Sequence, residues 1–136
     1  MTYPHSSTGG RLIELSADDC WELLRSEPVG RLAWNGASGP TVIPVNYAVS
    51  ANGIDIRTGA YSAAVRETDD SLITFQADEI DATTRTGWSV LAHGRAAIDW
   101  SDERAGTANV DVWVGGVKSL RLHVEVIEIT GRRLAD

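Results

Sequence analysis

The chain has 136 residues, of which 43% are hydrophobic, and it carries a formal net charge of −7. This length fits one folded domain, and no apolar run approaches the roughly 20 residues of a membrane-spanning helix. The acidic charge and the single lysine, Lys118, argue against a nucleic-acid partner or an anionic membrane surface, because both are bound through clustered basic side chains.

The N-terminal residues and the lone cysteine indicate how the chain is divided into domains and in which cellular compartment it folds. Residues 1–12 lack the basic and apolar regions of a secretion signal, so we expect a flexible leader followed by a single domain over residues 13–136. Cys20 has no partner for an internal disulfide, and its apolar neighbours at helical spacing indicate a small buried thiol. We therefore expect a soluble protein in the reducing cytoplasm.

The first predicted element is a helix that begins after Ser16. The serine hydroxyl can cap a free backbone N–H, and Asp18 and Asp19 lie at the positive end of the helix dipole. The helix is predicted to end near Glu27, because Pro28 disfavours helical geometry in the residue before it.

Beyond this helix the hydrophobic pattern alternates, which is typical of β-strands. Six strands are predicted, over residues 30–34, 41–49, 54–58, 71–78, 88–99 and 120–126. Short helices are expected at residues 63–66 and after Ser101, and Ile127 breaks the last alternation as a bulge would. So many strands in so short a chain leave open edges unless the sheet closes. We predict a mainly β fold, a six-stranded antiparallel barrel with short helices.

Spacing excludes several catalytic and metal sites. His5, His93 and His123 are scattered, and no paired Cys or His spacing of a zinc site occurs, so no metal is expected. Residues 87–91 lack the last glycine of a hydrolase nucleophile elbow, and no phosphate-binding glycine loop or dinucleotide fingerprint occurs. No residue is positioned well enough in the sequence to be named as a catalytic acid or base.

Three places on the strands suggest a ligand site, each with an ordinary alternative. Pro44 removes a ladder donor in mid-strand, which suits either a flat heteroaromatic ligand or a covered sheet edge. Arg57 and Thr58 offer donors for a phosphate, although an arginine at a strand end is often only a solvated charge. Trp88 and Ser89 offer a stacking face and a hydroxyl, although a tryptophan is more common in a core or a subunit interface.

Six short motifs follow one another in a distinctive order. They are Val29-Gly30-Arg31-Leu32, Val42-x-Pro44-Val45-Asn46-Tyr47, Arg57-Thr58, Phe75-x-x-Asp78-x-Ile80-Asp81, Gly87-Trp88-Ser89-Val90-Leu91-x-x-Gly94 and Ile129-Thr130-Gly131-Arg132-Arg133. This order resembles the pyridoxamine 5'-phosphate oxidase-like, FMN-binding split-barrel proteins, especially their small single-domain members. The resemblance implies a split barrel and a homodimer that holds FMN in grooves at its interface.

The resemblance also implies a set of cofactor-binding residues, with the second predicted strand along the flavin ring and the Arg-Thr pair facing the ring edge and the phosphate. The implied residues are Val42, Pro44, Val45, Asn46, Arg57, Thr58, Ser62, Trp88, Ser89 and Arg121. Relatives usually carry a lysine that contacts the phosphate shortly after the Arg-Thr pair. Ala63 stands in its place here, and Arg66 is the nearest cation that can substitute.

From this resemblance we expect an FMN-dependent oxidoreductase that acts on a small organic substrate, with a nicotinamide or a deazaflavin as reductant. Two alternatives remain open. One is a non-catalytic module that binds FMN, a deazaflavin or haem for storage or sensing. The other is a dimeric split barrel without a cofactor. Both are favoured by the alanine at position 63.

Overall fold

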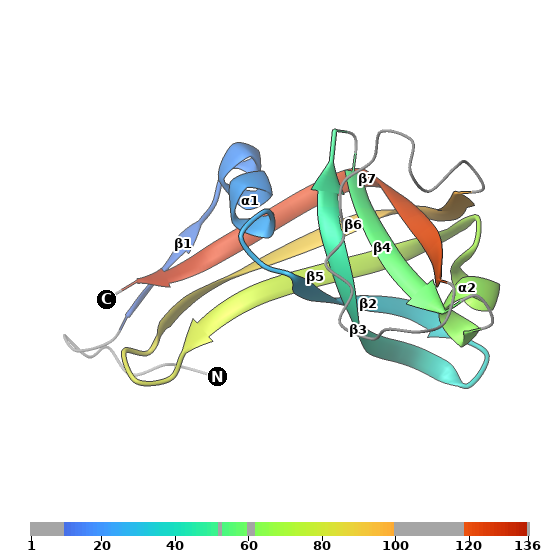
Figure 1. Cartoon of the computed structure of the whole chain (residues 1–136). Helices are drawn as coiled ribbons and strands as arrows, with labels where there is room; N and C mark the ends of the chain where they lie inside the picture. The colour runs from blue at the N-terminus through green and yellow to red at the C-terminus, as the bar shows by residue number, and fades with distance from the viewer. Residues whose placement is uncertain (1–9, 52, 60–61, 100–118, 136) are drawn as a thin grey trace.

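The computed structural model describes residues 10–51, 53–59, 62–99 and 119–135, which form antiparallel strands and two short helices (Figure 1). In chain order these are β1 (Arg11–Glu14), α1 (Ala17–Leu24), β2 (Val29–Gly36), β3 (Gly39–Ser50), β4 (Gly53–Gly59), α2 (Ala63–Thr68), β5 (Ser71–Asp81), β6 (Thr86–Asp99) and β7 (Ser119–Ala135). The predicted mainly β fold is confirmed. The helix expected after Ser101 lies outside the described residues.

One strand, β1, is additional to the six predicted. Its four side chains are all exposed, so it carries no alternation of apolar and polar residues by which it could be recognised. It forms through backbone pairing alone, with Arg11–Glu14 antiparallel to Arg132–Ala135 of β7. Residues 11 and 12, expected to belong to the leader, are therefore part of the sheet.

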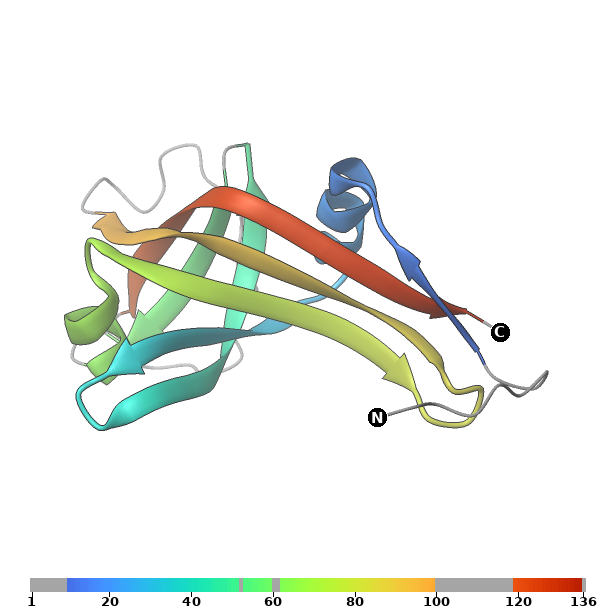
Figure 2. The ribbon, with the colours of Figure 1, turned by 180° about the vertical axis from the view of Figure 1, so that it is seen from behind.

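Strands β2 to β7 close into a barrel. The sheet order is β1-β7-β4-β3-β2-β5-β6, and β6 pairs in turn with β7, which joins the two sides of the ring. Closure removes most of the exposed edges that six open strands would present, and part of β3 keeps an open edge. The ends of β5, β6 and β7 run on beyond the ring as a long ribbon that carries α1 and β1 (Figure 2).

Alternate side chains of the six strands point into the barrel and form its core. The buried apolar residues of these strands are Leu32, Trp34, Val45, Tyr47, Ile54, Ile56, Ile73, Phe75, Ala77, Trp88, Val90, Ala92, Ala96, Leu122 and Val124. Tyr47 and Phe75 meet edge to face, with ring centroids 4.7 Å apart. Gly30 leaves room for that ring, because a Cβ there would lie 2.2 Å from Phe75 Cζ.

Helix α1 packs on the core with Cys20 and Leu24. It begins at the predicted cap, where the Asp19 N–H donates to Ser16 Oγ over 3.2 Å. It ends at Leu24 rather than near Glu27, and the Tyr47 hydroxyl donates to the Leu24 carbonyl over 2.5 Å. Cys20 is buried as predicted, and burial raises the pKa of its thiol.

The predicted bulge in the last strand is confirmed. His93 of β6 pairs with Glu128, and the next residue, Gly94, pairs with Val126. Ile127 is therefore the extra residue of β7, and its side chain is exposed.

Glu67 of helix α2 accepts two hydrogen bonds from the hairpin formed by β2 and β3. One carboxylate oxygen accepts from Trp34 Nε1 over 3.2 Å, and the other accepts from the Ala37 N–H over 3.1 Å. These hydrogen bonds, with the Ala37 N–H first, hold the pKa of Glu67 below its ordinary value of 4.5.

We expect the contribution of Glu67 to stability to disappear in acid. A carboxylate with a lowered folded-state pKa stabilises the fold above its unfolded pKa, and the effect is lost as the pH falls through the folded-state value. Thermal melting of the wild type and Glu67→Gln should therefore differ near neutral pH and converge below about pH 4.5. Glu128→Gln, an exposed strand substitution, is the control. A difference for Glu67→Gln that stays constant down to strong acid would contradict this role.

Candidate functional site

Strands β3 and β4 separate and form a fork. Their ladder covers only Asn46–Ser50 and Gly53–Arg57. Beyond it, residues 39–45 pair with β2 alone, and residues 58–59 pair with β7 alone. Figure 1 shows the two strands close together at their shared turn and apart toward α2. Among the described residues, no strand pairs with the open edge of residues 39–45. That edge offers backbone N–H and C=O groups to a ligand.

The predicted residues of β3 divide between the two faces of the barrel wall. Val42, Pro44 and Asn46 share a parity opposite to that of the core residues, so they lie on the outer face, and the first two are exposed. Pro44 lies in the open half of β3, which pairs with β2 alone. Its missing N–H therefore removes no hydrogen bond to a second neighbouring strand. Val45 points into the core, so only its backbone can face the fork.

A row of polar side chains crosses the outer face at the base of the fork. Asn46 lies opposite Arg57, and Arg57 lies opposite Arg121. Arg121 is in turn opposite Asp99, with which it forms an ion pair, and it is only 2% exposed. Directly opposite residues of an antiparallel pair share a face, so the structure brings three of the predicted site residues together. We call Arg57, Arg121 and Asp99 the arginine row.

The adjacent row on the same face holds a second charged pair. His123 Nδ1 lies 2.8 Å from Asp55 Oδ1, and Asp55 is 1% exposed. This hydrogen bond raises the pKa of His123 above 6.5, although burial opposes the rise. The second oxygen of Asp55 is buried without a hydrogen-bond partner in the described part of the chain. A proton on His123 therefore compensates a buried carboxylate.

Sequence reasoning missed Asp55, Asp99 and His123. Alternation with the apolar residues beside them places all three on the outer face, which is the one signal that the sequence contains. Their pairing depends on the registers of β4 and β6 with β7, which join residues far apart in the chain.

Thr58 and Ser62 form a separate polar contact at the end of β4. Thr58 follows Arg57 directly and so points to the opposite face of the strand. The two hydroxyl oxygens of Thr58 and Ser62 lie 3.0 Å apart, and Ser62 Oγ accepts the Val65 N–H over 3.3 Å as the cap of α2.

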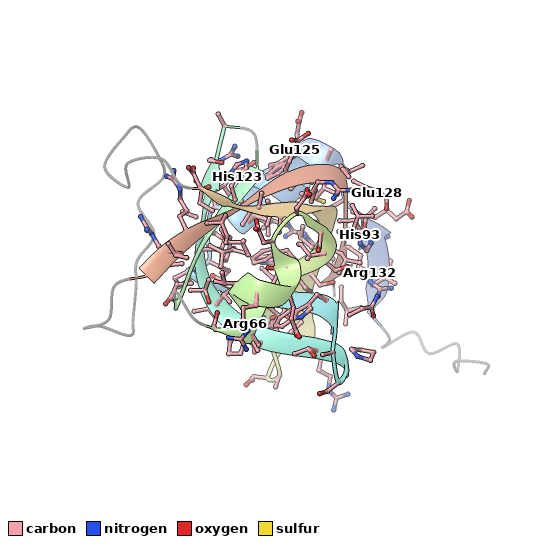
Figure 3. All side chains as sticks on the ribbon, turned by 90° about the vertical axis from the view of Figure 1, so that its right-hand side faces the viewer. Arg66, His93, His123, Glu125, Glu128 and Arg132 are labelled. Carbon is pink, nitrogen blue, oxygen red and sulfur yellow. The ribbon has the colours of Figure 1, made fainter. Side chains whose placement is uncertain are left out.

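The position of the missing lysine lies at the start of α2. Ala63 is the first residue of this helix and is exposed. Arg66, the predicted substitute, is also exposed, and Figure 3 shows it on the side of the barrel away from His123.

Trp88 and Ser89 are not brought to the fork. They lie near the start of β6, whereas Asp99 ends it, so Trp88 lies roughly 36 Å along the strand from Asp99. The Trp88 side chain is 8% exposed and belongs to the core, so it cannot stack on a ligand outside the barrel.

Ser89 points outward and contributes to a cavity on the long ribbon. The cavity has a volume of about 490 Å³ and is also lined by Glu14, Gln76, Val90, Leu91, Thr130, Gly131 and Arg132. Its polar lining comes from four strands, β1, β5, β6 and β7. Ser89 thus belongs to a cavity on the outer face, apart from the fork.

The described residues contain neither a cluster of metal ligands nor a membrane-spanning helix. No group of three or more His, Cys, Asp or Glu side chains there could hold a metal ion. Neither described helix has the length and apolar character needed to cross a bilayer.

Comparison with known proteins covers nearly all of the chain. The sequence model of the pyridoxamine 5'-phosphate oxidase family matches residues 16–133. An uncharacterised protein of Mycobacterium tuberculosis, Rv0080, is 30% identical over 130 residues, which are 90% of this chain and 86% of that protein.

Solved structures agree with this result. The FAD-binding protein from Mycobacterium smegmatis superposes with a TM-score of 0.73 at 26% identity, over 90% of this chain and 98% of its own. A FAD-binding protein from Mesorhizobium loti gives a TM-score of 0.76 at 22% identity, over 94% and 100% of the two chains. The predicted split-barrel fold is confirmed by these likenesses.

Proposed function

The chain belongs to the pyridoxamine 5'-phosphate oxidase family, and we propose from this premise that it binds FMN at the fork and acts as a flavin-dependent oxidoreductase. The observation that carries the proposal is the open edge of β3 beside Arg57. Backbone donors and acceptors along residues 39–45 suit the polar edge of a flavin ring. A guanidinium suits its phosphate, which it binds bidentately.

The chain's own groups would bind and orient the cofactor. Arg57 is partly exposed and would neutralise the phosphate, while the exposed Val42 and Pro44 would lie against the ring. Arg121 is too deeply buried to touch a ligand and would act through its charge. A bound flavin supplies hydride transfer. We expect a small organic substrate and a nicotinamide or deazaflavin reductant, in the cytoplasm.

We also propose that the working protein is a homodimer. Within one chain Arg57 and Ser89 are separated by four strand spacings around the outside of the barrel, roughly 19 Å. Side chains on a convex surface diverge, so one planar ligand cannot contact both. A second copy that brings its Ser89 cavity against the fork would complete the site, with Gln76 and Arg132 facing the ligand.

One observation favours the alternative of a non-catalytic module for a flavin, a deazaflavin or haem. Ala63 puts a methyl group where relatives carry a phosphate-binding lysine, and Arg66 lies further along α2. A charge-assisted hydrogen bond is worth about 1.5 to 3 kcal/mol, so FMN affinity should be moderate rather than tight.

Reconstitution with FMN tests the proposal and separates it from the alternative. We expect one FMN per chain, bleaching of its absorbance by NADH, NADPH or a reduced deazaflavin without oxygen, and recovery when an organic acceptor is added. Failure to bind FMN or a deazaflavin would refute the flavin site. A bound flavin that no reductant bleaches would identify a binding or sensing module instead.

A further inference from the structure

We propose that His123 determines how strongly the fork prefers a phosphorylated flavin over an unphosphorylated one, because its proton sets the charge of the surface around the arginine row. This inference rests on the proposed flavin site and adds a specificity-determining residue to it. His123 would not touch the ligand. It would act through the charge that it adds beside Arg57 and Arg121.

The geometry places two charged rows side by side on one face. The arginine row runs across β4, β7 and β6, and the Asp55–His123 pair joins β4 to β7 one row away. His123 and Arg121 are two residues apart on β7, and Asp55 and Arg57 are two apart on β4, so the rows are about 7 Å apart. At that separation a unit charge in one row is felt in the other.

The sign of the effect follows from the charges in the two rows. With His123 protonated, three positive side chains face two negative ones, Asp55 and Asp99, and the group carries one net positive charge. Without that proton the group is neutral. A phosphate at Arg57 is therefore attracted more strongly while His123 holds its proton, whereas an uncharged ribityl chain gains nothing.

The buried carboxylate of Asp55 stabilises the proton on His123. Its carboxylate is almost fully enclosed and forms a hydrogen bond with His123. In the described part of the chain, the charged groups on the same face around His123 are Asp55 and Arg57 from β4, Asp99 and Arg95 from β6, and Arg121 and Glu125 along β7. Asp55 and Asp99 raise the pKa of His123 and Arg121 lowers it, with a net rise, so the proton is lost above pH 6.5.

Affinities for FMN and riboflavin measured across this range provide the test. Riboflavin lacks the phosphate, so the ratio of the two affinities isolates its contribution. The titration begins at about pH 6.5, where the phosphate is already mostly dianionic, and runs upward. In the wild type we expect the ratio to fall about three- to tenfold as the pH rises, which is the effect of one charge at this distance in partly screened surroundings.

Two variants give opposite expectations. His123→Gln leaves a neutral group, so its ratio should be low and independent of pH. Asp55→Asn combined with His123→Gln removes both charges and restores one net positive charge, so its ratio should be high and independent of pH. His93→Gln, an exposed histidine on β6 outside both rows, should behave like the wild type. A wild-type ratio that does not change with pH, or equal ratios in the two His123 variants, would overturn the inference.

An anion without a flavin separates this inference from the flavin proposal. Sulfate keeps its charge over the whole range, so its stabilisation of the protein against heat, relative to chloride at equal ionic strength, reports anion binding alone. A sulfate effect that decreases with pH in the wild type but not in His123→Gln would support the role of His123 even if no flavin binds. The absence of such a difference, with flavin binding intact and its ratio constant, would refute it.

Discussion

Replacing Arg57 by alanine is expected to weaken FMN binding about tenfold to a hundredfold and to leave riboflavin binding nearly unchanged. The guanidinium lies at the base of the fork and is the partly exposed arginine of its row. A charge-assisted hydrogen bond contributes about 1.5 to 3 kcal/mol, and each 1.4 kcal/mol is a tenfold change in affinity. Titration of flavin fluorescence at fixed pH and salt measures both constants.

Two further variants test whether the loss of FMN affinity in Arg57→Ala comes from a lost phosphate contact. Arg57→Lys keeps the charge but not the planar fork of donors, so it should bind FMN with intermediate affinity. Arg11→Ala removes an exposed arginine of β1 and should change neither affinity. Equal weakening of FMN and riboflavin by Arg57→Ala would mean that the substitution disturbs β4 rather than a phosphate contact.

Leu122→Ala is expected to lower the free energy of unfolding by about 2 to 5 kcal/mol, the largest stability effect that we predict. Leu122 is fully buried, and its neighbours across the ladder are Ile56 of β4 and Ile98 of β6. The substitution leaves a cavity at the centre of the wall that joins these strands. Urea unfolding at equilibrium, followed by tryptophan fluorescence, gives the difference.

The matched control is Leu134→Ala on the same strand. Leu134 is 39% exposed and lies on the ribbon beyond the ring, so its truncation should cost less than about 1 kcal/mol. Comparable losses in the two variants would show that burial in the barrel does not set the stability of β7.

Local signals in the sequence were sufficient for most of the elements. The Ser16 cap depends on contacts within one helical turn, and the bulge at Ile127 on a break in the alternation of one strand. The core faces of β5 and β6 also follow from alternation. Each of these features is decided by residues close together in the chain.

The site was harder to predict because it depends on register. Alternation alone places Trp88 on the same face as Val90, in the core, and so favours the ordinary alternative over the stacking role that the resemblance implies. The contact of Asp55 with His123 had no such signal. It arises because β4 pairs with β7, and nothing in either strand specifies the other as its neighbour.

The strand that closes the ring also sets when the ring can form. β7 borders β6 along most of its length, with β4 and then β1 on its other side, and it comes last among the described elements. While a ribosome is still making residues 119–135, β4 and β6 lack the strand that pairs with both of them. Their apolar side chains are then not covered by β7. Such late, long-range pairing slows folding and prolongs the exposure of apolar, aggregation-prone surface. The ring therefore cannot close during synthesis until β7 has emerged from the exit tunnel.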